Sequence, residues 1–398
     1  MSNITYPLAT ATWDQAEYEA IERVIDSGMF TMGSNVLAFE QQFAKYVGSR
    51  YCVMVNSGSS ANLVMVAALR YRRDGTALAP GAEVIVPAVS WSTTYYPLYQ
   101  YGLKLRFVDI DPHTLNYDLD ALQRAITPDT RAIMAVNLLG NPNDFERIHE
   151  IAQAHNLTLL EDNCESMGAT FHGKQCGTFG LMGSFSAFFS HHISTMEGGM
   201  VVTDDEELYH IMLSLRAHGW TRNLPRDNRI CAKRDDPFEE SFRFVLPGYN
   251  LRPLEMSGAI GLEQVKKLPE MIEARRANAT RFAEVMSEFS WIRIQREIGA
   301  SSWFGFSMLM EDNAPVQRRE LANALMAAQI DCRPIVAGNF AKNSEVLKWM
   351  PHSVAGTLSN AERVDQRGLF IGNHHYPLLQ EFEHLASTLR KVAGKSRV

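Results

Sequence analysis

The sequence predicts an α/β protein built on a mainly parallel sheet with helices on both faces. Short apolar runs alternate with amphipathic segments through the first half of the chain. Turn-forming stretches such as Asp109-Ile110-Asp111-Pro112 separate these segments. Alternation of this kind is typical of βα units, because parallel strands need a long crossover between them. A chain of 398 residues is also long enough for two domains.

The expected elements follow in chain order. Two amphipathic helices, over residues 13–27 and 36–47, end at Gly28 and Gly48, since glycine readily adopts the left-handed turn after a helix. Buried strands are predicted at 51–55, 83–86, 105–108, 132–136 and 157–160. Further helices are predicted from the turn after the first strand to residue 70, over 119–125 and over 145–155.

The second half of the chain is expected to be organised differently. A helix over 256–267 is predicted to be interrupted at Pro269 and followed by a second helix, because proline lacks an N–H and clashes with the preceding turn. Residues 221–240 are charged and contain two prolines, which indicates a mobile excursion outside the core. We therefore expect a large domain over 1–255, including the N-terminal helices, and a smaller C-terminal α+β domain over 256–398.

Composition restricts the function classes. The chain is 46% hydrophobic and 21% charged, as soluble globular proteins are, and its net charge of −7 disfavours nucleic acid or an anionic membrane as a partner. No apolar run approaches ~18 residues and the N-terminus lacks a signal-peptide pattern, so we expect a cytoplasmic protein without a membrane span. Five scattered cysteines without C-x-x-C spacing predict reduced thiols rather than a metal or iron–sulfur site: Cys52, Cys164, Cys176, Cys231 and Cys332.

A small-residue turn over residues 56–62, with the sequence Asn-Ser-Gly-Ser-Ser-Ala-Asn, joins the first strand to a helix. Small side chains let a ligand approach the backbone, and a helix N-terminus offers free N–H groups to a phosphate. Gly58, Ser59 and Ser60 are therefore candidate phosphate ligands. An ordinary serine-rich N-cap turn is the alternative.

Two further candidates stand where predicted strands end. Asp162 follows the strand at 157–160, with Glu165 close behind, and an aspartate there can keep a pyridine nitrogen protonated. Its alternative role is that of a helix cap. Trp91 follows the strand at 83–86, where its indole could stack on a planar ring, although a tryptophan is more often part of the core.

Residues 184–199 contain a histidine pair and end in Glu-Gly-Gly, and no lysine occurs between Gln175 and Ala232. Together with the phosphate turn, Trp91 and Asp162 in this order, the segment resembles the cofactor loop of the DegT/DnrJ/EryC1/StrS sugar aminotransferases. These belong to fold type I of the pyridoxal-phosphate enzymes. The resemblance covers about residues 13–389 and includes an Asn-Leu-Arg string that begins at Asn250.

The resemblance implies an aspartate aminotransferase-like fold and non-covalently held pyridoxal 5′-phosphate, alternating with pyridoxamine 5′-phosphate. Counted back without gaps from Glu197-Gly198-Gly199, His191 occupies the position of the family's cofactor-binding lysine. Histidine cannot form that covalent link, but it accepts protons near neutral pH. We therefore expect His191 to be catalytic, and His192 to point the other way if the segment is extended.

The resemblance also implies binding roles by matching position. Four residues would bind the cofactor phosphate: Gly58, Ser59, Ser60 and Ser186. Three would surround its ring: Trp91, Asp162 and Glu165. Asn250 would reach the phosphate of a partner subunit, since the family builds its active sites across a homodimer interface. Seven residues would contact the nucleotide, sugar and diphosphate of the substrate: Met29, Phe30, Thr31, His218, Arg222, Arg252 and Arg333. For the last four, an ordinary surface ion pair is the alternative.

The histidine loop is most similar to one lysine-free branch of the family, the 3-dehydratases of GDP-4-keto-6-deoxy-D-mannose. This likeness implies that glutamate donates an amino group and that the sugar loses its C3 hydroxyl, in deoxysugar biosynthesis of the colitose type. Three alternatives stay open: a dehydratase of a CDP- or dTDP-sugar, an aminotransferase that uses Lys174, and a non-catalytic cofactor-binding regulator. No iron–sulfur partner is expected, because the cysteines lack any C-x-C pair.

Overall fold

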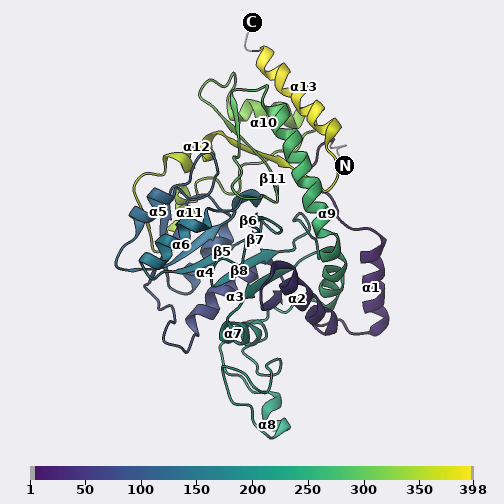
Figure 1. Cartoon of the computed structure of the whole chain (residues 1–398), viewed down its shortest axis with the longest axis vertical. Helices are drawn as coiled ribbons and strands as arrows, with labels where there is room; N and C mark the ends of the chain where they lie inside the picture. The colour runs from purple at the N-terminus through teal and green to yellow at the C-terminus, as the bar shows by residue number, and fades with distance from the viewer. Residues whose placement is uncertain (1–4, 396–398) are drawn as a thin grey trace.

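The computed structural model describes residues 5–395 and has one large sheet with helices on both faces (Figure 1). The strand order is β1-β9-β8-β5-β4-β2-β3-β12, and only β9 runs antiparallel to its neighbours. The predicted mainly parallel α/β sheet is therefore confirmed. The strands are β1 (Tyr51–Val55), β2 (Glu83–Pro87), β3 (Lys104–Val108), β4 (Thr130–Val136), β5 (Thr158–Asp162), β8 (Met182–Ser186), β9 (Gly199–Thr203) and β12 (His352–Val354).

The sheet is buried from both sides, which explains why its strands are continuous apolar runs rather than alternating ones. On β1, Val53 and Val55 face α3 (Gly58–Arg70), α4 (Ser92–Gln100) and α7 (Glu206–Arg216). Cys52 and Met54 face α2 (Ser34–Val47) and α9 (Glu255–Met286) on the other side. Further along that second face lie α5 (Leu119–Ala125) and α6 (Phe145–Ala154).

A second, antiparallel sheet consists of β10 (Ile292–Ile294), β11 (Gly305–Met310) and β13 (Gly368–Gly372). It packs with α10 (Arg318–Ala327) and α13 (Leu379–Lys395) around its own core. Tyr6 is buried in this core and donates a hydrogen bond to the Gly372 carbonyl at 2.7 Å. The domain boundary after residue 255 stays a prediction. Both the N-terminal segment and β12 cross it, because Tyr6 packs with the small sheet and β12 pairs with β3.

The predicted interruption at Pro269 is wrong. A single helix, α9, runs from Glu255 to Met286 with Pro269 inside it. Proline removes one backbone hydrogen bond, but tertiary burial on both sides of it compensates for the loss. Leu268, Met271 and Ile272 are all buried, the first and last of them against α2 and β1.

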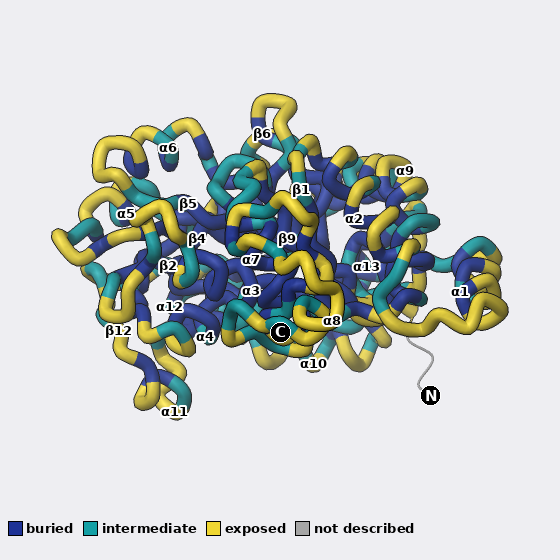
Figure 2. Tube along the Cα trace, turned by 90° about the horizontal axis from the view of Figure 1, so that it is seen from below, coloured by how far each residue is buried: buried dark blue, intermediate teal, exposed yellow. Residues whose placement is uncertain are grey.

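Residues 221–240 form an excursion only in part, because Thr221, Leu224 and Ile230 are buried, the last two in the core beside α3 and α7. They follow α7 and form an extension that carries the short helix α8 (Pro237–Ser241), at the bottom of Figure 1. Most of the tube around α8 is exposed in Figure 2. The separate helix α1 (Gln15–Ser27) projects at another edge and contacts α9. Among residues 5–395 no helix is long and apolar enough to cross a membrane.

Candidate active site

A cavity of about 320 Å³ opens at the carboxyl ends of β2, β4, β5 and β8. This edge of an open parallel sheet is where ligands bind in α/β proteins. Eight of the residues that the sequence singles out line it: Gly58, Ser59, Trp91, Asp162, Glu165, Ser186, His191 and Arg333. The fold thus brings together side chains that are more than 270 positions apart in the chain.

The predicted phosphate turn forms the N-terminus of α3 at one wall of the cavity. Ser57 is the N-cap, and its hydroxyl oxygen accepts a hydrogen bond from the Ser60 N–H at 3.1 Å. Ser60 is thereby engaged within the turn and does not line the cavity, whereas Ser57 does. A Cβ on Gly58 would lie 2.6 Å from the Ser186 Cβ, so only glycine fits there. Because the side chains of this turn are small, the first N–H groups of α3 can face a ligand.

Asp162 is a buried carboxylate with an imposed orientation. Its Oδ2 accepts hydrogen bonds from Asn62 Nδ2 at 2.8 Å and Thr94 Oγ1 at 2.7 Å, and its Oδ1 accepts one from the Cys164 N–H at 3.2 Å. Asn62 is fixed in turn, because its Oδ1 accepts from Ser184 Oγ at 2.6 Å. A carboxylate held in this way fits a protonated ring nitrogen of a ligand.

Glu165 lies beside Asp162 in the cavity wall. Its Oε2 accepts a hydrogen bond from the Leu139 N–H at 3.0 Å. Leu139 has a φ of +56°, a left-handed conformation that leucine rarely adopts, and this conformation helps to direct its N–H at the carboxylate. Burial raises the pKa of Glu165 to about 7, against the opposing charge of Arg333. Glu165 can therefore exchange a proton near neutral pH.

His191 is oriented through one ring nitrogen. Its Nδ1 lies 2.8 Å from the Cys164 carbonyl oxygen, which can only accept, so Nδ1 carries the proton and Nε2 has a free lone pair. The imidazole also contacts the Phe304 ring, with centroids 5.0 Å apart. Burial and the charge of Arg333 lower the pKa of His191 to about 4. At neutral pH the side chain is thus an uncharged base in the cavity.

His192 lies on the opposite side of the loop and does not line the cavity. It is fully buried, and its Nε2 donates to the Ser302 carbonyl at 3.2 Å. Lys174 stands in a hairpin between β6 (Thr170–Phe171) and β7 (Lys174–Gln175). Its ammonium lies over the Phe179 ring, 4.8 Å from the centroid, and it too is absent from the cavity wall.

Two of the lining residues have surfaces free for a ligand. Trp91 stands at the rim with 56% of its surface exposed. The Arg333 guanidinium lies over the Phe370 ring, 4.5 Å from the centroid; its charge acts on Glu165, but no described carboxylate pairs with it within 4 Å. An arginine without a carboxylate partner in a cavity is a binding group for an anion.

The other predicted residues do not line this cavity. Met29 and Phe30 are half exposed, and Thr31 pairs with Leu254 near the start of α9. Four more lie on or next to the extension after α7: His218, Arg222, Asn250 and Arg252. Arg222 lies over the Trp220 ring, and Arg252 Nε donates to Asn250 Oδ1 at 3.1 Å. Neither of these two arginines forms an ion pair with another residue in the described part of the chain.

Sequence reasoning missed the residues that orient the site. Thr94 and Phe304 belong to no motif, Asn62 ends the turn sequence without an assigned role, and the Cys164 carbonyl has no side-chain signature at all. Asn62 lies 100 positions and Thr94 68 positions from the Asp162 that they hold. The only available signal was the position of Asn62 one turn into the helix after the phosphate turn, where a polar residue on a buried helix is unusual.

The DegT/DnrJ/EryC1/StrS aminotransferase family matches residues 12–390, and the chain belongs to this family. Two relatives carry the name GDP-4-keto-6-deoxy-D-mannose 3-dehydratase. The one from Yersinia pseudotuberculosis is 60% identical, with 98% of this chain and 99% of the relative covered. The one from Escherichia coli O55:H7 is 58% identical, with 97% and 100% covered.

Solved structures agree with this placement. The E. coli GDP-4-keto-6-deoxy-D-mannose-3-dehydratase with bound hydrated PLP matches with a TM-score of 0.95 and 58% identity, covering 97% of this chain and 99% of that one. Structures of GDP-4-keto-6-deoxymannose-3-dehydratase with a trapped PLP–glutamate geminal diamine, and of a histidine-to-asparagine mutant with bound GDP-perosamine, match equally well. Each has a TM-score of 0.95 and 57% identity, covering 97% of this chain and 100% of theirs.

Proposed function

We propose that this chain catalyses the pyridoxal-phosphate- and glutamate-dependent removal of the C3 hydroxyl from GDP-4-keto-6-deoxy-D-mannose. The product is GDP-4-keto-3,6-dideoxy-D-mannose. One observation carries the proposal: in an aminotransferase cavity without a lining lysine among the described residues, a neutral histidine presents an oriented, free Nε2. The names and bound ligands of the similar proteins support the substrate and the cofactor.

The cavity fits pyridoxal phosphate at its two ends. Gly58, Ser59 and Ser186 stand with the N-terminus of α3, where a phosphate gains N–H donors and the positive end of the helix dipole. Asp162 would hold the ring nitrogen protonated, Trp91 would stack on the ring, and Glu165 would border it. When bound, the cofactor supplies an electron sink that stabilises the negative charge left by a departing proton.

His191 then acts as the base and acid of the reaction. Its Nε2 accepts the α-proton of glutamate in the first stage, and in the second it accepts the proton whose loss expels the C3 hydroxyl. The resulting imidazolium Nε2–H donates a proton to that hydroxyl, which leaves as water. A low pKa makes His191 neutral before each transfer and a strong donor afterwards. Histidine, unlike lysine, cannot use its own nitrogen to displace an amino-sugar product from the cofactor. Elimination of the C3 hydroxyl therefore competes successfully with amino transfer.

The anionic groups of the substrate require positively charged side chains, and among the described residues Arg333 is the arginine that lines this cavity. The remaining candidate binding residues do not line the cavity of the chain to which they belong: Met29, Phe30, Thr31, His218, Arg222, Asn250 and Arg252. We propose that they serve the cavity of a second copy in a homodimer with shared active sites. Exposed apolar side chains near the cavity mouth support an interface there, namely Trp91, Phe188 and Phe189.

The test is mass spectrometry of GDP-4-keto-6-deoxymannose incubated with the protein, pyridoxal phosphate and glutamate. A sugar product lighter by one oxygen atom, with 2-oxoglutarate and ammonia released, is the expected result. An amino sugar would instead establish an aminotransferase. Glutamate conversion without any change in the sugar would direct the search to CDP- or dTDP-sugars, and no conversion of either substrate would favour a non-catalytic cofactor-binding regulator.

We further propose that the chain acts in the cytoplasm, in deoxysugar biosynthesis of the colitose type for a lipopolysaccharide O-antigen; the names of the similar proteins support the deoxysugar pathway. The arrangement of Lys174 speaks against the aminotransferase alternative, because its ammonium lies over Phe179 in the β6–β7 hairpin and does not line the cavity. The structure holds no cluster of potential metal ligands between residues 5 and 395, and the proposed chemistry uses none.

A further inference from the structure

The loop over residues 187–198, which contains His191, lies between β8 and β9 without regular secondary structure. On the cavity side, it is held by the bond from His191 Nδ1 to the Cys164 carbonyl at 2.8 Å, and on the opposite side by the bond from His192 Nε2 to the Ser302 carbonyl at 3.2 Å. Three residues after His191, both backbone groups of Ser194 bind side chains from outside the loop. The Ser194 N–H donates to Gln264 Oε1 at 2.9 Å, and the Ser194 carbonyl accepts from Trp13 Nε1 at 2.9 Å.

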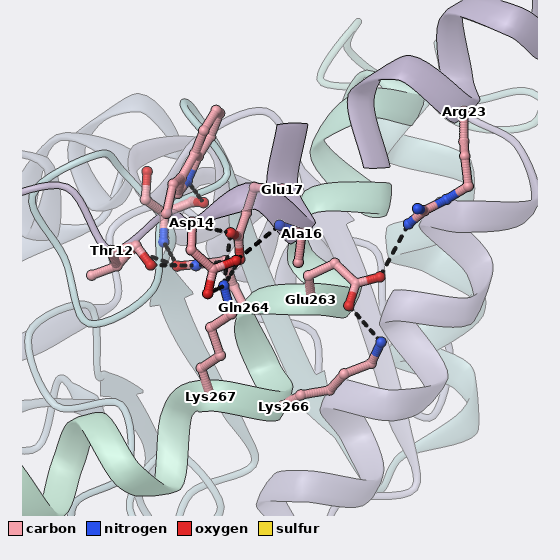
Figure 3. A network of polar contacts seen from close by, with 11 residues as sticks. Thr12, Asp14, Ala16, Glu17, Arg23, Glu263, Gln264, Lys266 and Lys267 are labelled. Atoms are coloured by element: carbon pink, nitrogen blue, oxygen red, sulfur yellow. Dashed lines mark hydrogen bonds and ion pairs between the residues drawn. The ribbon is translucent and has the colours of Figure 1, made fainter. Parts of the chain in front are cut away.

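Gln264, on α9, uses all the hydrogen-bonding capacity of its buried amide. Besides Ser194, its Oε1 accepts from Thr12 Oγ1 at 2.6 Å. Its Nε2 donates to the Thr12 carbonyl at 3.1 Å and to Glu17 Oε1 at 2.8 Å. Figure 3 shows Thr12, Glu17 and Gln264 converging at this point. No donor or acceptor is left over, so the amide has a single allowed orientation, with its oxygen toward Ser194.

A partly buried ion pair between Glu17 and Lys267 fixes that orientation of the Gln264 amide. Glu17 has no exposed surface, and both of its carboxylate oxygens lie 2.8 Å from Lys267 Nζ. Because Glu17 Oε1 can only accept while it is ionised, the Gln264 NH₂ group must face it. Lys267 also pairs with Asp14 at 2.8 Å, where the capping box of α1 begins. The chain before α1 is thus locked onto α9, as Figure 3 shows.

We infer that Gln264, together with Trp13, is a positioning residue for His191. The inference rests on the proposed function. A lysine joined to the cofactor is positioned by its own covalent bond, whereas an untethered histidine depends on the protein to bring Nε2 to the reacting carbon. Rates of such proton transfers fall steeply when the base is displaced by about 1 Å. The Ser194 anchor limits how far the loop can carry His191 away from the cavity.

The experiment compares Gln264→Met with the unmutated chain, both loaded with pyridoxal phosphate. Single-turnover absorbance measurements with glutamate give the rate constant of conversion to the amine form and the glutamate Kd. We expect the rate constant to fall about 10- to 100-fold while the glutamate and cofactor Kd values change by less than about 3-fold. Trp13→Phe, which removes the other anchor of Ser194 and keeps an aromatic ring, should show the same pattern more weakly.

Glu263→Ala is the matched control, because it removes the ion pair between Arg23 of α1 and the residue next to Gln264 but leaves the Glu17–Lys267 pair and both bonds to Ser194 in place. It should leave the single-turnover rate constant unchanged. Rate constants in Gln264→Met and Trp13→Phe equal to that of the unmutated chain, with only the Tm reduced, would overturn the inference and leave the proposed function intact. If the unmutated chain itself fails to convert glutamate, the proposed function is wrong and the inference falls with it.

Discussion

At the scale of single residues, the orientation of His191 comes from a main-chain group. The Cys164 carbonyl accepts from Nδ1 and so selects the tautomer with a free Nε2. Two residues before Cys164, Asp162 is held by Asn62 and Thr94 on the neighbouring elements. The end of β5 and the residues directly after it therefore orient both His191 and Asp162, the base and the ring-facing carboxylate of the proposed mechanism.

Replacing His191 by lysine tests this arrangement directly. In His191→Lys the new amine should bind the cofactor covalently and dehydration should fall by about 100-fold or more, since general acid–base catalysis by Nε2 is lost. Borohydride treatment followed by mass spectrometry should find the cofactor mass on that peptide. His191→Asn is the control and should show neither the covalent adduct nor dehydration. A lysine variant that still dehydrates the sugar would refute the role of His191.

At the scale of elements, two helix N-termini meet at Glu255. This residue begins α9, and its carboxylate accepts from the Gly33 N–H at 2.6 Å and the Asn35 N–H at 2.6 Å, at the start of α2. One buried anion thereby satisfies donors of α2 and lies at the positive ends of two helix dipoles. The α2–α9 layer that covers β1 from one side depends on this contact.

Glu255→Ala should therefore destabilise the fold by about 2–4 kcal/mol, because several N–H groups lose their acceptor at a buried site. Urea unfolding followed by circular dichroism measures the change. Glu255→Gln keeps an acceptor oxygen and should lose less than half as much. Equal losses in the two variants would show that the charge, not the hydrogen bonds, is responsible.

Element by element, the sequence predicts most of the large sheet. The apolar runs at 51–55 and 83–86 match β1 and β2 to within one residue, because parallel strands buried on both faces leave a clear pattern. Prediction from the apolar pattern fails where tertiary contacts determine the local structure. Pro269 lies inside α9 because packing outweighs the lost hydrogen bond, and β12 reaches the large sheet from the second half of the chain.

The candidate site divides in the same way. His191, Asp162 and the phosphate turn follow strands directly and are found from local sequence. Asn62 and Thr94 act on Asp162 across the sheet, and Gln264 acts on the histidine loop from another helix. Contacts between distant segments have no local signature, so the residues that orient the site need the fold.

At the scale of the whole molecule, a buried cation joins α9, which packs on the large sheet, to residues that flank β11 and β13 of the small sheet. Arg275 on α9 donates to the Phe304 carbonyl at 3.1 Å and the Asn373 carbonyl at 2.8 Å and has no ion-pair partner among the described residues. Its charge acts on four buried or partly buried histidines: His191, His192, His374 and His375. Burial first, and then the charge of Arg275, lower the pKa of His374 to about 4.

These histidines must therefore stay neutral in the folded chain. Their pKa values in the folded state lie below the ordinary 6.5, so their contribution to stability is complete above pH 6.5 and is lost as the pH falls toward 4. We expect this contribution to the free energy of unfolding of the cofactor-free protein to fall between pH 7 and pH 5, by about 2 kcal/mol each for His191 and His374, while the raised pKa of Glu165 acts in the opposite direction over the same range. His374→Gln, outside the cavity, should flatten this dependence; an unchanged slope would contradict the assignment.

The proposed sharing of active sites between two copies leads to a complementation test. Mixing His191→Asn with Arg252→Ala, after gentle unfolding and refolding together, should recover about a quarter of the unmutated activity, because half of the dimers are mixed and each has one intact site. Mixing His191→Asn with Asp162→Asn provides the control without recovery, since both residues line the same chain's cavity. Equal activity in the two mixtures would exclude a shared site.

The Ser194 anchor also has a consequence for biosynthesis on the ribosome. Trp13 lies 181 residues before Ser194, but Gln264 follows it by 70 residues. A nascent chain that ends before Gln264 already contains His191 and the phosphate turn, yet it lacks the acceptor for the Ser194 N–H. Since translation proceeds from the N-terminus, the histidine loop reaches its final conformation only after α9 has been made. Nascent chains that end before Gln264 are therefore expected to be inactive and to consume neither glutamate nor the nucleotide sugar.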